Sequence, residues 1–205
     1  MNNTKERILE TTAEQFRRYG YTGTGMKQIV TGANAPFGSI YHFFPGGKEQ
    51  LGEETIRRSG EMYYEIFETI FAQAPDPVIA MRDFFMGAAV VLRETDYADA
   101  CPIATVALEV ASTSEPLRQA TADVFESWVT RAAARFTEAG IAPKRSRELA
   151  IEFIALLEGA FVLSRAARST EALEVAGANA TAAVAAALGE ERSRNVVPAS
   201  TGPSS

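Results

Sequence analysis

The spacing of apolar residues constrains the fold of this chain more than any other feature. Almost throughout its 205 residues, apolar positions recur three and four residues apart, the period of a helix that buries one face. Runs that alternate apolar and polar residues, as half-buried strands do, are missing. The chain is therefore predicted to be all-α, with about nine helices.

The first two helices are expected near the N-terminus. Thr4 is a suitable cap for the first, and the glycine-rich segment "YGYTGTG" ends it. A short second helix then begins after Gly25, where the side chain of Gln28 can reach back to the backbone amide of the cap.

A tight turn is predicted in "GANAP", residues 32–36. Asn34 tolerates the left-handed backbone that such a turn needs, and Pro36 suits the first position of a third helix over 36–43. Two short helices joined in this way form a helix-turn-helix, whose second helix enters the major groove of DNA.

Longer helices follow, and they divide the chain into three parts. We expect a helix-turn-helix domain over 1–48, a larger helical domain over 49–189 and a disordered tail rich in serine and proline over 190–205. The helices of the larger domain are predicted at about 48–73, 76–95, 101–112, 115–139, 144–168 and 170–188.

Composition excludes several classes of protein. Cys101 is the single cysteine and His42 the single histidine, so neither a disulfide framework nor a zinc site is expected. No phosphate loop, nucleophile elbow or metal cluster indicates an enzyme, and no cofactor is predicted. The uncharged run Val175–Gly189 is rich in alanine and too weakly hydrophobic to span a membrane, so we expect a cytoplasmic protein.

Charge is distributed unevenly along the chain. The net charge is −6, yet residues 1–60 carry eight Lys or Arg against six Glu. A slightly basic N-terminal module on an acidic body is what a DNA-binding protein with a separate regulatory domain would show, although this signal alone is weak.

The third helix has two distinct faces. Ile40 and Phe44 lie four residues apart and are expected to pack inward. The other face leaves aromatic, small and hydrogen-bonding groups for DNA, and Lys48 opens the next helix where it could meet a phosphate. The alternative for Tyr41 and His42 is that they only pack within a small aromatic cluster.

The segment "ILETTAEQFRRYGYTGTGMKQIVTGANAPFGSIYHFFPGGKEQL", residues 8–51, resembles the DNA-binding module of TetR-family transcriptional regulators. The resemblance implies phosphate contacts from Tyr41, His42 and Lys48 and base contacts from residues 37–39. It departs from the family pattern at Gly25, at Phe37 and in the longer "PGGKEQL" corner. The full predicted DNA-binding set is Thr24, Lys27, Pro36, Phe37, Gly38, Ser39, Tyr41, His42 and Lys48.

The later segment "ACPIATVALEVASTSEPLRQA", residues 100–120, resembles the subgroup typified by the LmrA and YxaF repressors. The family resemblance implies an inducer pocket in the acidic domain, built from large or soft side chains. The alternative is that these residues are simply core. The candidate ligand-binding residues are Met62, Phe67, Phe71, Phe84, Phe85, Cys101, Glu109 and Trp128, with Met86 beside them.

Two carboxylates interrupt apolar helices and need partners, because an unpaired buried carboxylate is costly. They are Glu109 in "IATVALEVA" and Glu158 in "FIALLEGAFVL". A structural partner, either an arginine (Arg82, Arg93 or Arg165) or a backbone amide, is favoured over a ligand for both.

The segment "AIEFIALLEGAFVLSRAAR" is apolar nearly all round, which predicts a second buried surface in addition to the chain's own core. The resemblance implies that the last two helices pair with their copies in a homodimer. The predicted interface residues are Phe153, Leu156, Ala160, Leu163, Ala183 and Ala187.

These features together predict a ligand-responsive repressor that binds a palindromic, double-stranded operator as a homodimer and is released by a small aromatic or drug-like inducer. An alternative is a helical regulator controlled by a protein partner or by its abundance. A helical enzyme or carrier with a vestigial DNA module is a third hypothesis, disfavoured because residues 61–205 lack histidine and any catalytic cluster.

Overall fold

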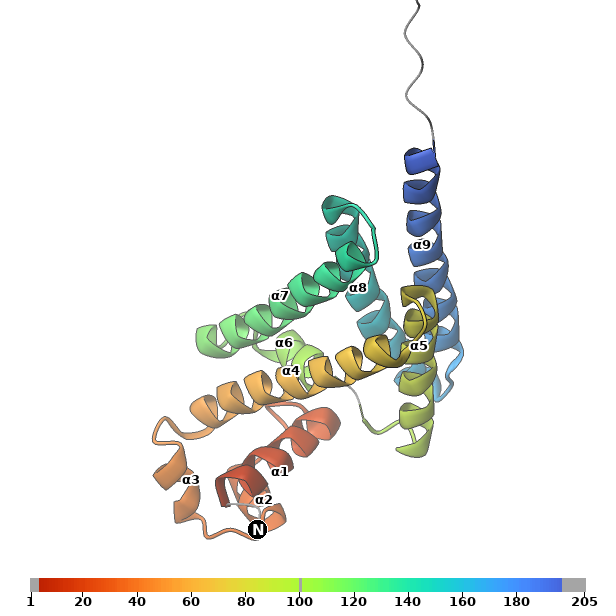
Figure 1. Ribbon diagram of the computed structural model, residues 1–205. Coiled ribbons are helices and arrows are strands. Elements are labelled where there is room, and N and C mark those ends of the chain that lie inside the picture. Colours follow the sequence, from red (N-terminus) through yellow and green to blue (C-terminus); the bar gives the residue numbers. More distant parts are fainter. Residues whose placement is uncertain (1–3, 100, 197–205) are drawn as a thin grey trace, which may run out of the picture.

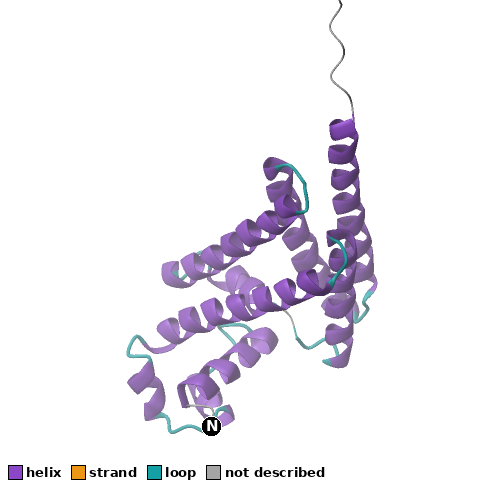
Figure 2. Ribbon diagram, in the orientation of Figure 1, coloured by secondary structure: helices purple, strands orange, loops and turns teal. Residues whose placement is uncertain are grey.

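The computed structural model describes residues 4–99 and 101–196, and within these ranges every regular element is a helix (Figure 2). The prediction of an all-α chain with about nine helices is confirmed. In chain order the helices are α1 Thr4–Tyr19, α2 Met26–Gly32, α3 Gly38–Phe43, α4 Gly47–Gln73, α5 Pro77–Glu94, α6 Pro102–Val110, α7 Glu115–Glu138, α8 Pro143–Ala167 and α9 Glu171–Val196.

Helices α1, α2 and α3 form a small unit, here called the head, which packs against the N-terminal part of α4 (Figure 1). Its core contains Ile8, Ile29, Ile40 and Phe44, and Leu51 of α4 joins the same cluster. Surface ion pairs add to this contact, including Lys5 with Glu54 at 2.7 Å. The head is therefore carried on the first turns of α4.

The turn between α2 and α3 has the expected backbone. Asn34 has a φ of 46°, and the Arg7 side chain of α1 donates from Nε to the carbonyl of Ala33 at 3.0 Å. The side chain of Gln28 accepts a hydrogen bond from the amide of Gly25 at 2.8 Å, which confirms the predicted cap. Helix α3 begins at Gly38 rather than at Pro36, whose carbonyl accepts from the amide of Ser39.

An apolar cluster joins the head to the rest of the chain. Phe16 of α1 is fully buried with Ile56 of α4, Val106 of α6 and Leu117 of α7. We call this group the junction core. Because its members come from head and body alike, neither part buries this surface without the other.

Helices α4 to α9, here called the body, share one large core. In it α9 packs along α5 and α8, and α8 packs on α7 (Figure 1). Gly177 of α9 permits a close approach to α5, because a Cβ at this position would lie 2.7 Å from the Cβ of Phe85.

Helix α9 is longer than expected. It extends to Val196, whereas we predicted that it would end at 188 and that a disordered tail would start at 190. The sequence "EERSRN" over 190–195 contains neither proline nor glycine, so nothing stops the helix before Pro198. Residues 197–205 of the predicted tail lie outside the described residues.

The segment Glu171–Glu191 of α9 is long and apolar enough to cross a membrane by length and composition, contrary to our expectation for this region. A core helix of a globular domain passes the same test. Here Leu173, Ala180 and Val184 are buried in the body core, which accounts for the apolar character of this face.

The contact at Gly177 leads to a stability prediction. Gly177→Ala should lower the free energy of unfolding by about 1–3 kcal/mol, because the added methyl group pushes α9 away from Phe85. Urea unfolding would measure the change. Gly189→Ala on the same helix is the control, since a Cβ there meets nothing within 4 Å. Equal stabilities of the two variants would contradict the close packing.

Candidate functional site

Helix α3 presents a polar and aromatic face at the end of the molecule remote from the C-terminal end of α9 (Figure 1). Ile40 and Phe44 are fully buried, as predicted, while Phe37 is 50% and Tyr41 55% exposed. Of the remaining predicted DNA contacts, Lys27, Pro36, Gly38 and His42 are exposed and Ser39 is half-buried. The arrangement leaves this face free to meet a large partner.

Gly38 has no intramolecular reason to be glycine. A Cβ built on it meets no atom within 4 Å, and its φ is not in the left-handed region. The absence of a side chain therefore matters only to something outside the described chain that approaches α3 closely.

Thr24 does not fit the DNA-binding set. Its side chain is 1% exposed, and its hydroxyl donates to the carbonyl of Gly20 at 2.6 Å. The segment after α1 folds back so that this hydroxyl satisfies the C-terminal end of α1. The prediction of a DNA contact from Thr24 is therefore wrong for this conformation.

Lys48 is half-buried rather than free at the surface. Its ammonium lies 4.4 Å from the centre of the Tyr21 ring, a cation–π contact. Burial lowers the pKa of Lys48, and the nearby Glu109 carboxylate acts in the opposite direction. The ammonium has three N–H donors and the side chain is only partly buried, and a phosphate contact from Lys48 stays a prediction.

Glu109 lies at the junction between head and body, and it does not line the cavity described below. Its Oε2 accepts from the amide of Thr22 at 2.7 Å. A Cβ on Gly20 would lie 1.6 Å from its Oε1, and Gly20 has a φ of 71°. The assignment of Glu109 to the ligand-binding residues is therefore wrong, whereas the favoured expectation of a structural partner is confirmed, and that partner is a backbone amide.

The body contains a partly open cavity of about 290 Å³ lined mainly by α4, α5, α7 and α8. Four of the predicted ligand-binding residues line it: Phe67, Phe84, Cys101 and Trp128. The indole N–H of Trp128 donates to the carbonyl of Gly60 at 2.9 Å, which fixes this ring against α4. Aromatic and aliphatic side chains form most of the wall.

The other predicted pocket residues lie elsewhere. Met62 and Met86 are on the outer surface, 42% and 59% exposed. Phe71 stacks on Phe67, with ring centres 4.1 Å apart, but does not line the cavity, and Phe85 is 2% exposed within the core. Helical spacing showed that these positions are apolar, but not which of them border empty space.

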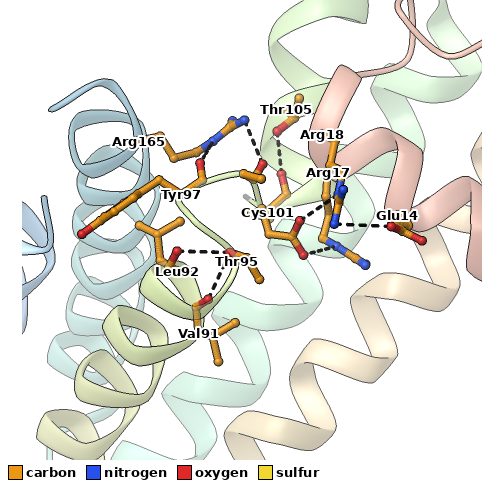
Figure 3. A network of polar contacts seen from close by, with 12 residues as sticks. Glu14, Arg17, Arg18, Val91, Leu92, Thr95, Tyr97, Cys101, Thr105 and Arg165 are labelled. Carbon is orange, nitrogen blue, oxygen red and sulfur yellow. Dashed lines mark hydrogen bonds and ion pairs between the residues drawn. The ribbon is translucent and has the colours of Figure 1, made fainter. Parts of the chain in front are cut away.

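The polar groups at one end of the cavity are Arg17, Asp99, Cys101 and Glu158. The Arg17 guanidinium pairs with Asp99, Nε to Oδ2, at 3.1 Å, and Arg18 pairs with the other carboxylate oxygen at 3.4 Å (Figure 3). Our predictions missed Arg17 and Asp99. No local signal marks them, because an arginine at the end of α1 meets the loop after α5 only in the folded chain.

Glu158 faces the same end of the cavity from α8. Burial raises its pKa to about 7, and the thiol of Cys101 is its hydrogen-bond partner, which acts to lower that pKa. Burial also raises the pKa of the Cys101 thiol well above its ordinary value, so this cysteine is a poor nucleophile at neutral pH. At neutral pH the pair is therefore a partly ionised acid beside a protonated thiol.

The predicted dimer residues divide between two faces of α8 and α9. Phe153, Ala160 and Ala187 are 5%, 4% and 3% exposed within their own chain, so their assignment to an interface is wrong. Leu156 and Ala183 are partly buried, whereas Leu163 is 62% exposed. Both faces of α8 are apolar, and periodicity cannot tell which one meets the chain's own core.

An exposed apolar surface does exist on these helices. Its members are mostly small or aliphatic side chains that follow the outward faces of α8 and α9: Ile151, Ala155, Val162, Leu163, Val175, Ala178, Ala182 and Ala186. We call it the α8–α9 face.

Comparison with known proteins assigns both parts of the chain. Residues 8–55 match the family of bacterial regulatory proteins named after TetR, and residues 77–179 match the C-terminal domain of LmrA/YxaF-like transcriptional regulators. The chain is 35% identical over 162 residues to YxaF of Bacillus subtilis, an uncharacterized HTH-type transcriptional regulator, covering 79% of this chain and 85% of YxaF. It is 29% identical to LmrA of the same organism, an HTH-type transcriptional regulator, covering 83% and 91%.

Solved structures show the same fold. A TetR transcriptional regulator from Legionella pneumophila superposes with a TM-score of 0.78 at 23% identity, over 88% of this chain and 96% of that one. The reduced form of NemR from E. coli superposes with a TM-score of 0.72 at 20% identity, over 87% and 95%.

The environment of Glu158 predicts how stability depends on pH. In the unfolded chain this acid ionises near 4.5, and in the folded chain near 7. Between pH 4.5 and 7 the acid ionises more readily in the unfolded chain, so the free energy of unfolding of the wild type falls as the pH rises. Above pH 7 the acid is ionised in both states, and this loss of stability stays constant. Glu158→Gln removes this cost, which is about 3 kcal/mol above pH 7.

Thermal unfolding of wild type and Glu158→Gln at pH 4.5, 6 and 8 would measure the effect. The stability of the variant relative to wild type should rise with pH. Glu148→Gln, an exposed position on the same helix, should show no such trend. A pH-independent difference for Glu158→Gln would mean that the acid is not held in an unfavourable site.

Proposed function

The chain belongs to the TetR family of bacterial regulatory proteins and is a DNA-binding transcriptional regulator, and on this basis we propose that it is a repressor released by a small, mostly apolar ligand. The observation that carries the proposal is the cavity of about 290 Å³, because Arg17 of the head forms part of its wall. A ligand in this space would touch the DNA-binding unit directly.

The outward face of α3 supports a role in reading DNA. Tyr41 and His42 can donate to phosphate oxygens without a full charge, and Phe37 could contact a thymine methyl group. Gly38 would let the backbone approach the groove closely. The base sequence that is read does not follow from these contacts.

The α8–α9 face supports a homodimer. Small residues such as Ala155, Ala182 and Ala186 allow helices of two copies to pack closely, and their burial would remove an exposed apolar surface. A two-fold axis here would place two copies of α3 on the two halves of a palindromic operator, with centres about 34 Å or a multiple of this apart.

Two connections could transmit ligand binding to the head. Helix α4 runs without a break from Leu51 in the head core to Phe67 in the cavity wall. The ion pair between Arg17 and Asp99 joins α1 to the cavity directly. A ligand that favours one arrangement of these elements by about 1–3 kcal/mol would change operator affinity 5- to 150-fold.

Control by a protein partner or by abundance, the alternative, would not require a cavity, so the open space in the body favours a small ligand. A repressor acts where the chromosome is, and we place the protein in the cytoplasm accordingly.

A gel-shift titration with the DNA that flanks the chain's own gene would test the proposal, with salt and a panel of apolar compounds as variables. A specific shift released by one compound is the expected result. A specific shift that no compound releases would favour control by a partner. The absence of a shift, followed by failure to select sites from random DNA, would overturn the DNA-binding proposal.

Substitution of Gly38 separates DNA contact from folding. Gly38→Ala should leave the melting temperature unchanged or slightly raised, because the added methyl group meets nothing in the chain and alanine favours a helix. Operator affinity should fall at least tenfold if backbone approaches DNA at this point. Unchanged affinity would show that α3 does not come close to DNA at Gly38.

Two further variants test the predicted phosphate contacts. Tyr41→Phe and Lys48→Ala should each weaken operator binding. Lys48→Ala should also lower the slope of log affinity against log salt concentration by about one, because one fewer phosphate is neutralised. Binding curves at several salt concentrations measure both effects, with size-exclusion chromatography as the check on assembly. An unchanged salt slope for Lys48→Ala would mean that its ammonium stays on the Tyr21 ring in the complex.

A further inference from the structure

Glu158 lines the cavity and forms no ion pair with any residue in the described part of the chain. Its one hydrogen-bond partner there is the thiol of Cys101, a weak donor, and no cation contributes to its environment. A carboxylate has two oxygens that can accept several bonds, so most of its capacity is unused. Removing such a group from water without a partner is costly.

The other carboxylate of the cavity differs in this respect. Asp99 pairs with both Arg17 and Arg18 (Figure 3). Arg17 also contacts Tyr63. Asp99 and Arg17 thus already have partners of opposite charge. An anionic ligand would have to compete for Arg17, whereas a cationic ligand would find Glu158 without a counter-ion.

Aromatic rings surround the same space. Helices α4, α5, α7 and α8 each contribute at least one ring to the cavity wall: Tyr63, Phe67, Phe84, Trp128, Phe153 and Phe161. The faces of aromatic rings attract cations, most strongly where water is excluded. An acid that shares a cavity wall with aromatic rings is the chemistry that recognises an ammonium group attached to an apolar body.

We propose that the ligand of this cavity is an apolar, aromatic molecule that carries one protonated amine, and that Glu158 is the counter-ion of this amine. The inference rests on the proposed ligand-binding function and specifies its chemistry. The size of the cavity suits two aromatic rings, since an apolar cavity of about 150 Å³ binds one benzene.

The charged and titratable groups that face Glu158 come from several elements. Cys101 stands at the start of α6, Asp99 in the loop before it, Arg17 on α1 and Tyr63 and Tyr64 on α4. Burial raises the pKa of both tyrosines to about 12, and it also keeps the thiol protonated, so none of them changes charge between pH 6 and 8. Glu158 is the member of this set that titrates there.

Calorimetric titration of the full chain with a matched pair of probes tests the proposal. The probes are 4-phenylbenzylamine and the neutral 4-phenylbenzyl alcohol, which share the two-ring body. At pH 8 the amine should bind wild type at least tenfold more tightly than the alcohol. Glu158→Gln should abolish this preference and leave the alcohol unaffected, while Glu148→Gln should behave as wild type.

The wild type alone supplies a second readout. Lowering the pH from 8 to 6 should weaken binding of the amine about tenfold, because the carboxyl must lose its proton before it pairs with the ammonium. The same change of pH should leave the affinity for the alcohol unchanged. This pH comparison uses the wild type alone, so it tests the proposal even if Glu158→Gln fails to fold.

The remaining outcomes overturn the proposal in distinguishable ways. Equal or tighter binding of the alcohol, or an amine preference that survives in Glu158→Gln, would refute the amine assignment while leaving a ligand-binding cavity in place. Binding of neither probe would also refute it. Release of operator DNA by any other compound would then show whether the proposed function itself stands.

Discussion

Burial of Phe16 among α4, α6 and α7 is the contact on which the relation between head and body depends. The ring belongs to the last turn of α1, yet its neighbours Ile56, Val106 and Leu117 come from three helices of the body. Because the ring is fully enclosed, the residues that follow it are placed as well. Arg17 reaches the cavity, and the loop after α1 meets Glu109.

Polar contacts surround this junction core and bridge the same two parts. Arg17 and Arg18 pair with Asp99, and the amide of Thr22 donates to Glu109 at 2.7 Å. An apolar contact is non-directional, whereas these bonds require particular distances. They determine how the head is oriented on the body, and any ligand that disturbs the Asp99 end of the cavity acts on one of them.

The cavity lowers the stability of the body. A packed core would fill about 290 Å³ with side chains and would not hold an acid that has no ion pair with any described residue. Local departures from the rules of packing and charge pairing are expected at functional sites. Helix α8 combines these roles, with Phe153 in the core, Glu158 at the cavity and Leu163 exposed on the α8–α9 face.

The all-helical fold, the turn at Asn34 and the inward face of α3 could be predicted from the sequence, because each depends on local backbone preference and on the period of one helix. The packing of the folded chain sets which apolar face of α8 is buried, where Glu109 finds its partner and that Arg17 borders the cavity. Periodicity reports that a face is buried, and it carries no information about what covers that face. Contacts between residues such as Arg17 and Asp99, 82 positions apart, arise from the packing of whole helices.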